Sequence, residues 1–390
     1  MTLKQGRPED VGMSAEKIDV VRHRARKWIA DGMTPALVVL AARHGTVVLH
    51  EAFGRYGPDA DSRNLDVSAI FPLASISKVI TATAAMILVD DGLLALNRPV
   101  QDYLPEFVGE GKEQVMVHHL LTHTSGLRDN DVSAHSERKM ATAKIPPPDG
   151  NQHPEIHEWL YLAYDAPLSQ PTGQEMSYSG HGCDLLGEII RRTSGMNLGE
   201  LARGRVFQPL GMHDTFYAVP QQARDRLVHR PQDWPAARVV ENPSYLDRPS
   251  ASAGGWSTAM DMAVFCQMFL NGGTYGDSGI LSPASVSEMT RNQTPGVPSK
   301  FKGEYEREGS RGYGWDVKGQ KKPRYHGSLD SPTAFTHQGG GGVSILVDPA
   351  YDLITIYFSV ARGIMSPERY RPEWSMDLFT NMVTAAVIEP

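Results

Sequence analysis

Cysteine is scarce in this chain of 390 residues, which has only Cys183 and Cys266. Two thiols are too few for the disulfide framework that stabilises small secreted proteins, so the composition favours a reducing compartment. The first 14 residues are polar and contain no apolar segment of signal-peptide length. We therefore expect a cytoplasmic protein, although a chain that had lost a leader by processing would show the same pattern.

Runs of one charge and long apolar runs are also missing. The formal net charge is −7 and no extended basic segment is present, which argues against nucleic acid as a general partner. The most apolar stretch, residues 71–89, contains Pro72 and Lys78 and is shorter than the ~20 apolar residues that cross a bilayer, so we predict no membrane span. His119 and His123 are spaced like metal ligands on a helix, but no carboxylate or cysteine completes a set, so we predict no metal and no cofactor.

The stretch 71–89 nevertheless carries the main chemical signal. It is apolar nearly all round, which predicts a buried helix, and Lys78 is its single charge. Burial of an ammonium group is costly and lowers its pKa unless partners hold the charge. Ser75 lies one helical turn earlier on the same face, near N–H groups at the helix start that suit a developing oxyanion. The pattern predicts a serine activated by a lysine of lowered pKa; a chance Ser-x-x-Lys match is the alternative.

Segments with β-strand character lie at both ends of the chain. Residues 36–43 and 46–54 flank a His-Gly turn, which predicts a hairpin, and three further β-rich runs cover residues 333–338, 343–347 and 353–360. Helical patterns dominate the middle, except that residues 129–170 are polar and irregular, with a short helix expected near residues 156–164.

These patterns predict an α/β (α+β) fold. One antiparallel β-sheet is built from both termini and flanked by helices, and a mostly helical domain is inserted into it. The expected sheet domain comprises residues 1–72 and 251–390, the helical domain comprises residues 73–250, and the active site lies at their interface.

Two more motifs could complete an active site. Tyr178-Ser179-Gly180 lies in a glycine-rich loop before a predicted helix. Its phenol could be held as phenolate by the Lys78 ammonium, or it could share one proton with a neutral Lys78. His337-Gln338-Gly339-Gly340 lies where a strand runs into glycines, which allow a backbone N–H to approach a bound substrate.

The motifs resemble those of the serine β-lactamase and penicillin-binding-protein superfamily, and most closely its class C β-lactamases and family VIII carboxylesterases. The first family motif, Ser-x-x-Lys, matches Ser75 and Lys78. The second, Tyr-x-Asn or a looser Tyr-x-x, matches Tyr178-Ser179-Gly180, and the third, Lys-Thr-Gly or His-x-Gly, corresponds to His337-Gln338-Gly339. Flanking text also matches, and the resemblance spans roughly residues 11–358.

The resemblance implies a role for each residue. Ser75 would attack the acyl carbon and hold the acyl-enzyme, while Lys78 and Tyr178 would together act as base and acid. The oxyanion hole would be formed by the backbone N–H groups of Ser75 and Gly340. Substrate contacts would come from His337, Gly339 and Trp315, with Trp315 on the pocket wall.

Two departures from the family pattern bear on the substrate. The family's third-motif lysine holds a substrate carboxylate, and His337 stands there; its second-motif asparagine contacts a substrate amide, and Gly180 stands there. Both changes suit an ester or an atypical amide that has no obligatory carboxylate. We therefore predict a serine hydrolase that forms an acyl-enzyme and acts as a carboxylesterase on small or medium esters.

Other functions stay open at this point. Within hydrolases they are a peptidase or amidase on unusual peptides (with D-residues or derived from cyclic ones), an acyltransferase, or a weak β-lactamase. From a different class comes a penicillin-binding-like sensor or binding module. The expected partner is a small ester, amide or peptide substrate, and the sequence leaves the oligomeric state open.

Overall fold

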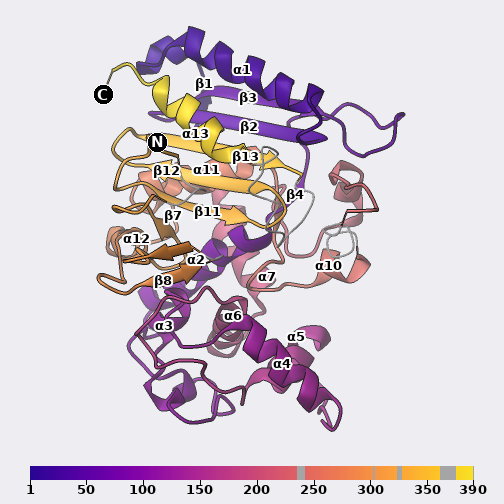
Figure 1. The fold of residues 1–390 in the computed structure, drawn as a ribbon, viewed down its shortest axis with the longest axis vertical. Helices are drawn as coiled ribbons and strands as arrows, with labels where there is room; N and C mark the ends of the chain where they lie inside the picture. The colour runs from indigo at the N-terminus through magenta and orange to yellow at the C-terminus, as the bar shows by residue number, and fades with distance from the viewer. Residues whose placement is uncertain (235–241, 302–303, 323–326, 361–374, 390) are drawn as a thin grey trace.

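A computed structural model of the chain describes residues 1–234, 242–301, 304–322, 327–360 and 375–389. A seven-stranded sheet, with strand order β1-β3-β2-β13-β12-β11-β10, lies in the upper half of Figure 1. Its strands are β1 (Lys4–Gln5), β2 (Ala36–Arg43), β3 (Thr46–Gly54), β10 (Asp316–Val317), β11 (Phe335–Gly339), β12 (Val343–Asp348) and β13 (Leu353–Ser359). Short two-stranded sheets pair β4 (Phe71–Pro72) with β5 (Trp256–Ser257), β6 (Thr274–Tyr275) with β7 (Ser278–Gly279), and β8 (Ser299–Phe301) with β9 (Glu304–Glu306).

The prediction of one sheet built from both termini is confirmed. Strands β2 and β3 form the expected hairpin, and β2 pairs with β13 in antiparallel register, with Leu40 opposite Ile356. The pair β1–β3 is parallel, which differs from the expected antiparallel arrangement at that edge. The β2–β13 pair joins strands more than 300 residues apart, so both chain ends are needed to complete the sheet.

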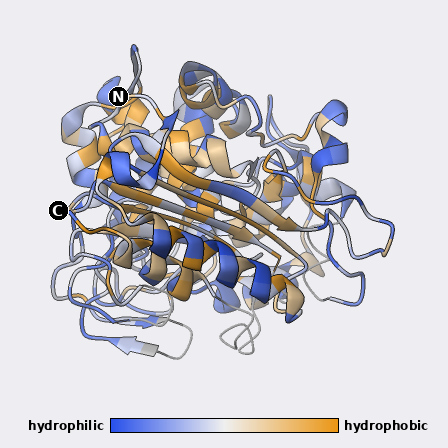
Figure 2. Ribbon diagram, turned by 90° about the horizontal axis from the view of Figure 1, so that it is seen from above, coloured by the Kyte–Doolittle hydropathy of each residue, from blue (hydrophilic) through white to orange (hydrophobic). Residues whose placement is uncertain are grey.

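Both faces of β2 are buried, which explains its continuous apolar sequence. Alternate side chains of a strand point to opposite faces. Val38 and Leu40 join the larger core cluster, to which α11 (Ala259–Leu270) also contributes, whereas Leu37 and Val39 join a second cluster with α1 (Ala15–Ala30) and α13 (Met376–Ala385). Figure 2 shows the hydrophobic strands beside helices that turn hydrophilic residues outward. The sheet is therefore covered by helices on both faces.

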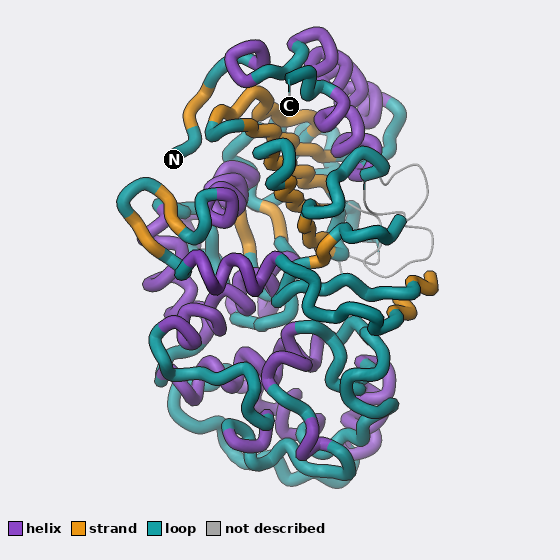
Figure 3. Tube along the Cα trace, turned by 90° about the vertical axis from the view of Figure 1, so that its left-hand side faces the viewer, coloured by secondary structure: helices purple, strands orange, loops and turns teal. Residues whose placement is uncertain are grey.

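The other helices lie mostly away from the long strands. They are α2 (Ser77–Asp90), α3 (Val117–Leu121), α4 (Asp129–Met140), α5 (Pro154–Ala163), α6 (Gly180–Ser194), α7 (Leu198–Ala202), α8 (Gln208–Leu210), α10 (Pro243–Asp247) and α12 (Pro283–Thr290). Figure 3 shows the long strands concentrated in the upper part of the molecule and mostly helices and loops in the lower part. Within the described residues, no helix combines the length and apolar character that a membrane crossing requires. The domain boundaries after residues 72 and 250 stay a prediction.

Helix α4 lies where an irregular segment was expected, and that expectation is wrong. The helix is polar nearly all round, because only Val132 and Ser136 of its residues are buried, so no apolar period marks it. Its charges suit the helix dipole, with Asp129 in the first turn and Lys139 in the last. Helices without an apolar face are difficult to detect from periodicity alone.

The apolar run 71–89 forms three elements instead of one helix. It begins with strand β4, continues through a 3₁₀ turn, η2 (Ala74–Ile76), and becomes α-helical at Ser77. Every residue of α2 up to Leu88 is buried, as its composition predicted. Ser75 therefore lies on the turn that leads into a buried helix.

Trp315 lies in the core, which corrects its expected place on a pocket wall. Its side chain is fully buried and packs edge-on against Phe269 and Phe335, with ring centroids 5.1 and 4.8 Å away. Phe269 belongs to α11 and Phe335 opens β11. Trp315 thus supports the strand that leads to the predicted third motif.

We expect Trp315→Ala to lower the free energy of unfolding by about 3–5 kcal/mol, the usual cost of a large buried cavity. Trp315→Phe, which keeps an aromatic ring, should cost less and leave KM for a small ester within about twofold of the wild-type value. Urea denaturation and steady-state kinetics measure both. An unchanged stability together with a raised KM would return Trp315 to the pocket wall.

Candidate active site

Ser75 lies at the apex of a strained turn. Ala74, directly before it, has φ +46°, a conformation that costs a residue with a side chain about 1–2 kcal/mol. The turn is held because the N–H of Leu73 donates to the carbonyl of Gly255 at 2.8 Å. Ala74 and Ile76 are buried, whereas Ser75 is half-buried. The strained turn therefore presents the Ser75 hydroxyl at the edge of an otherwise closed core.

Lys78 reaches Ser75 as their spacing predicted. Its Nζ lies 3.1 Å from Ser75 Oγ and donates to the carbonyl of Ser252 at 2.8 Å. The same Nζ lies 4.9 Å from the ring centroid of Tyr178. Lys78 is only 4% exposed, so protein groups replace the water that an ammonium would otherwise bind. The structure thus brings Ser75, Lys78 and Tyr178 together.

The pKa of Lys78 is raised, and the expectation of a lowered one is wrong. Burial is the largest single effect and lowers this pKa, but neighbouring acidic groups together outweigh it. Tyr178 acts through its charge and a hydrogen bond, and Asp129 adds a smaller effect. Lys78 therefore keeps its proton near neutral pH.

Tyr178 is held by groups on two sides. The ring of His123 packs against it at 4.5 Å between centroids, and His123 Nδ1 accepts the N–H of Ser179 at 3.2 Å. Ser179 caps α6 and donates from its Oγ to Asp129 at 2.7 Å. Burial keeps the pKa of His123 well below its usual value, so this ring is neutral. The neutral ring of His123 therefore positions Tyr178. Among the described residues, no group of three or more potential metal ligands occurs.

Strand β11 ends against the Ser75 turn. A side-chain carbon at Gly339 would overlap the carbonyl oxygen of Leu73, so only glycine permits this close approach. Arg230, which is almost fully buried, donates to the carbonyl of Gly341 at 3.0 Å and holds the following loop. These contacts place the Gly339-Gly340 segment beside the turn that carries Ser75.

His337, which stands where the family's third motif has a lysine, is neutral as expected. Its ring lies 6.3 Å from that of Tyr178, and its Nδ1 donates to the carbonyl of Gln338 at 3.0 Å. Burial, followed by the charges of Arg311 and Lys78, lowers the pKa of His337 to about 3. His337 therefore supplies no cation at neutral pH.

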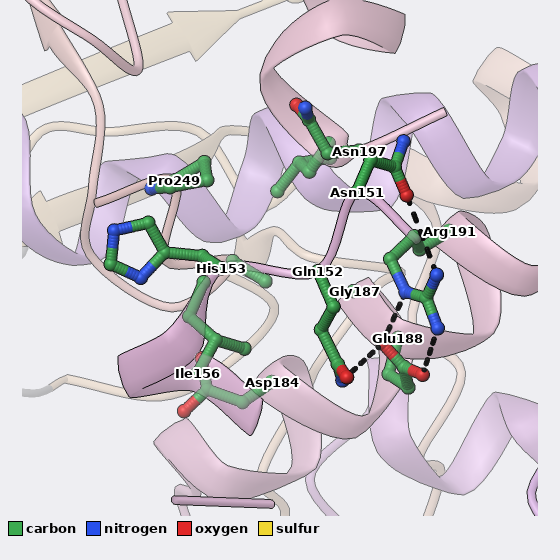
Figure 4. A pocket seen from close by; sticks show the side chains of 12 residues that line it. Asn151, Gln152, His153, Ile156, Asp184, Gly187, Glu188, Arg191, Asn197 and Pro249 are labelled. Carbon is green, nitrogen blue, oxygen red and sulfur yellow. Dashed lines mark hydrogen bonds and ion pairs between the residues drawn. The ribbon is translucent and has the colours of Figure 1, made fainter. Parts of the chain in front are cut away.

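A second group of residues supports Lys78 from behind. Asp184 on α6 accepts the N–H of Ser252 at 3.3 Å, and the Ser252 carbonyl in turn binds Lys78. Asp184 also lines a cavity of about 30 Å³, shown in Figure 4, together with Glu188, which is bonded to Gln152 and Arg191. Sequence reasoning missed Asp184, Arg230 and Asp129, because each acts through a contact distant in sequence.

Burial raises the pKa of Asp184 to about 6. The folded state then binds more protons than the unfolded state between about pH 4 and 6, so this group lowers stability as pH rises through that window. We expect Asp184→Asn to remove this dependence. The stability of the variant relative to wild type should increase by about 1–3 kcal/mol from pH 4 to pH 7 in denaturant titrations. Asp59 is exposed, so Asp59→Asn provides the control and should show no such trend. If the stabilities of Asp184→Asn and the wild type changed with pH in parallel, the raised pKa of Asp184 would be contradicted.

Comparison with known proteins identifies the family of this chain. Residues 25–374 match the family model described as Beta-lactamase. Protein Rv1367c of Mycobacterium tuberculosis is 31% identical over 321 residues, which cover 74% of this chain and 76% of that protein. Esterase EstB of Burkholderia gladioli is 30% identical over 324 residues, which cover 75% of this chain and 78% of that protein.

A solved structure shows the same fold. EstCE1, described as a hydrolase with promiscuous acyltransferase activity, superposes with a TM-score of 0.72 and 21% identity, covering 96% of this chain and 98% of that chain. The family match extends over most of the sequence, and two relatives at 30% identity or more cover about three quarters of it. The chain belongs to the Beta-lactamase family of serine hydrolases.

Proposed function

We propose that the protein is a serine carboxylesterase that works through a covalent acyl-enzyme at Ser75. The contact between Lys78 Nζ and Ser75 Oγ, 3.1 Å long and with the lysine 4% exposed, is the observation that carries the proposal. A serine of normal acidity is a weak nucleophile and needs a nearby group that accepts its proton. The buried pair, next to a tyrosine, supports that role.

Tyr178 is the group that takes the proton in this proposal. Because the raised pKa of Lys78 keeps it charged, Lys78 does not act as the base. Its ammonium instead stabilises the anionic oxygen of Tyr178, and the Ser75 proton moves to that oxygen as Oγ attacks the ester carbonyl carbon. The C=O π electrons move to the carbonyl oxygen and give a tetrahedral oxyanion.

The oxyanion is stabilised by backbone N–H groups of Ser75 and Gly340 in this scheme. The close approach of Gly339 to Leu73 supports the pairing, because it brings the two backbone segments together. When the oxyanion collapses, the bond to the alkoxide breaks and Tyr178 returns the proton to the leaving oxygen. Water then attacks the acyl carbon as Tyr178 again accepts a proton. The bond between that carbon and Ser75 Oγ breaks, Tyr178 returns the proton to Oγ, and the carboxylic acid leaves.

Esters fit the site better than substrates that need a carboxylate contact. His337 is neutral and Gly180 has no side chain, so the two family positions that would bind a carboxylate and an amide lack those groups. His337, Gly339 and Gly340 remain the proposed substrate contacts. The similarity to Esterase EstB supports the same substrate class.

We expect Ser75→Ala to abolish hydrolysis of p-nitrophenyl acetate, because the proposed acyl-enzyme forms on the Ser75 hydroxyl. A fluorophosphonate probe should label the wild type and leave the variant unlabelled, as shown by intact mass. Circular dichroism and thermal unfolding serve as controls for the fold. Undiminished turnover in the variant would refute the proposal.

A second set of variants tests the charge on Lys78. Tyr178→Phe and Lys78→Met should each lower kcat/KM by about two orders of magnitude or more, the scale of general acid–base catalysis. Lys78→Arg keeps the positive charge and should retain more activity than Lys78→Met. Equal losses in the two Lys78 variants would mean that the lysine acts as a neutral base.

A further inference from the structure

A buried cluster of charged side chains lies beside the proposed active site, and the proposed mechanism does not use it. It consists of Arg311, Asp316 and Lys321, whose side chains are 4%, 5% and 4% exposed. Arg311 Nη2 lies 3.1 Å from Asp316 Oδ2, and Lys321 Nζ contacts the other carboxylate oxygen. Among the described residues, Asp316 is the carboxylate that pairs with both cations. Because burial of charges on this scale gives little net stability, stability alone does not account for the cluster.

Arg311 is directed toward Tyr178. Its Cζ lies 5.6 Å from the centroid of the Tyr178 ring, close to the 4.9 Å that separates Lys78 Nζ from the same point. Tyr178 therefore has two cations within about 6 Å, the range over which a charge acts on an aromatic ring or its oxygen. The charge of Arg311 also contributes to the lowered pKa of His123 and of His337, and in both cases its effect exceeds that of Asp316.

The backbone before Arg311 is strained and clamped. Ser310 has φ +45°, and Lys321 Nζ donates to the carbonyls of Gly309 at 2.7 Å and Ser310 at 3.2 Å. Among the described residues, five residues other than glycine have positive φ: His44, Ala74, His123, Ser310 and Asp352. Three of these adjoin Ser75, Tyr178 or Arg311. Strain of this kind persists where surrounding contacts hold a functional group in place.

The hydrogen bonds of Arg311 leave part of its guanidinium uncompensated. Its Nε is buried and has no hydrogen-bond partner among the described residues. A group placed only for stability would be expected to satisfy its donors. The arrangement instead keeps a permanent positive charge at the ring of Tyr178.

We propose that Arg311 is a positioning residue that stabilises the anionic form of Tyr178 and so supplies the second fixed charge that the neutral His337 does not. This inference rests on the proposed function, in which Tyr178 accepts the proton of Ser75. Asp316 and Lys321 hold Arg311 and its backbone in place. Among the described residues, the Tyr178 ring is approached by Lys78 on α2, His123 after α3, Arg311 before β10 and His337 on β11. Cys183 on α6 and Asp129 on α4 act on Lys78, and Asp129 also accepts the N–H of Gly180.

The test is the pH dependence of kcat/KM for a neutral p-nitrophenyl ester. Loss of the cation disfavours the anionic base, so the acidic limb of the Arg311→Gln profile should move to higher pH. We expect kcat/KM at pH 6 to fall about tenfold or more, and at pH 9 to stay within about threefold of wild type. Arg311→Lys keeps a charge and should restore much of the wild-type profile.

A double variant serves as a control for effects on folding. Arg311→Gln leaves Asp316 without its arginine, which could destabilise the core. Arg311→Gln combined with Asp316→Asn removes this pair of charges with little change of shape and leaves the cation of Lys321. Its acidic limb should move in the same direction by a smaller amount. Thermal unfolding confirms that the variants compared are folded at both pH values.

Three results overturn the inference, and they are distinct from failure of the proposed function. If the folded single and double variants keep the wild-type pH profile, Arg311 does not act on Tyr178. If they lose activity equally at pH 6 and pH 9, the role is structural. If they lose only a preference for a matched ester carrying a carboxylate, Arg311 is a substrate contact. A wild-type protein that neither hydrolyses esters nor reacts with fluorophosphonate would instead refute the proposed function, and the inference with it.

Discussion

The structure depends on the solvation of one ammonium group. Lys78 lies in a helix whose other residues are mostly apolar, and its side chain is buried. Its charge is therefore stabilised by Ser75, by the carbonyl of Ser252 and by Tyr178, which come from three separate parts of the chain. Because an unpartnered buried charge is very costly, these segments must converge for the fold to be stable. The requirement that keeps Lys78 charged also assembles the proposed active site.

A second constraint is the close approach of two backbones. The Ser75 turn includes a strained alanine, and strand β11 touches the carbonyl of Leu73 at a position where no side chain fits. Backbone donors fixed in this way do not have to reorganise when charge develops on a substrate oxygen, which is the main advantage of an oxyanion hole built from the main chain. Trp315 and the aromatic residues around it support this strand from the core. The precision of the site thus depends on packing remote from the substrate.

The ionisable side chains around Tyr178 comprise two that are charged and two that are neutral. Burial keeps His123 and His337 neutral, while Lys78 and Arg311 remain charged. The site is therefore positive around the phenol, and no cation comes from the position where the family has its third-motif lysine. This distribution favours the anionic tyrosine that the proposed mechanism requires, and it gives a substrate carboxylate no cationic contact at His337.

The sequence by itself determined the local features. Ser75 and Lys78 meet because residues three apart share a helical face, the β2–β3 hairpin follows from a short turn between two apolar runs, and the sheet from both termini follows from where strands occur. Only the tertiary structure decided the sign of the pKa change at Lys78, the core position of Trp315, and the contacts of Asp184 and Arg311. The polar helix α4 also escaped prediction, because it has no apolar stripe. The reason is common to these cases: a pKa, a burial or a long-range contact depends on which groups the fold brings together, and that information is not carried by spacing along the chain.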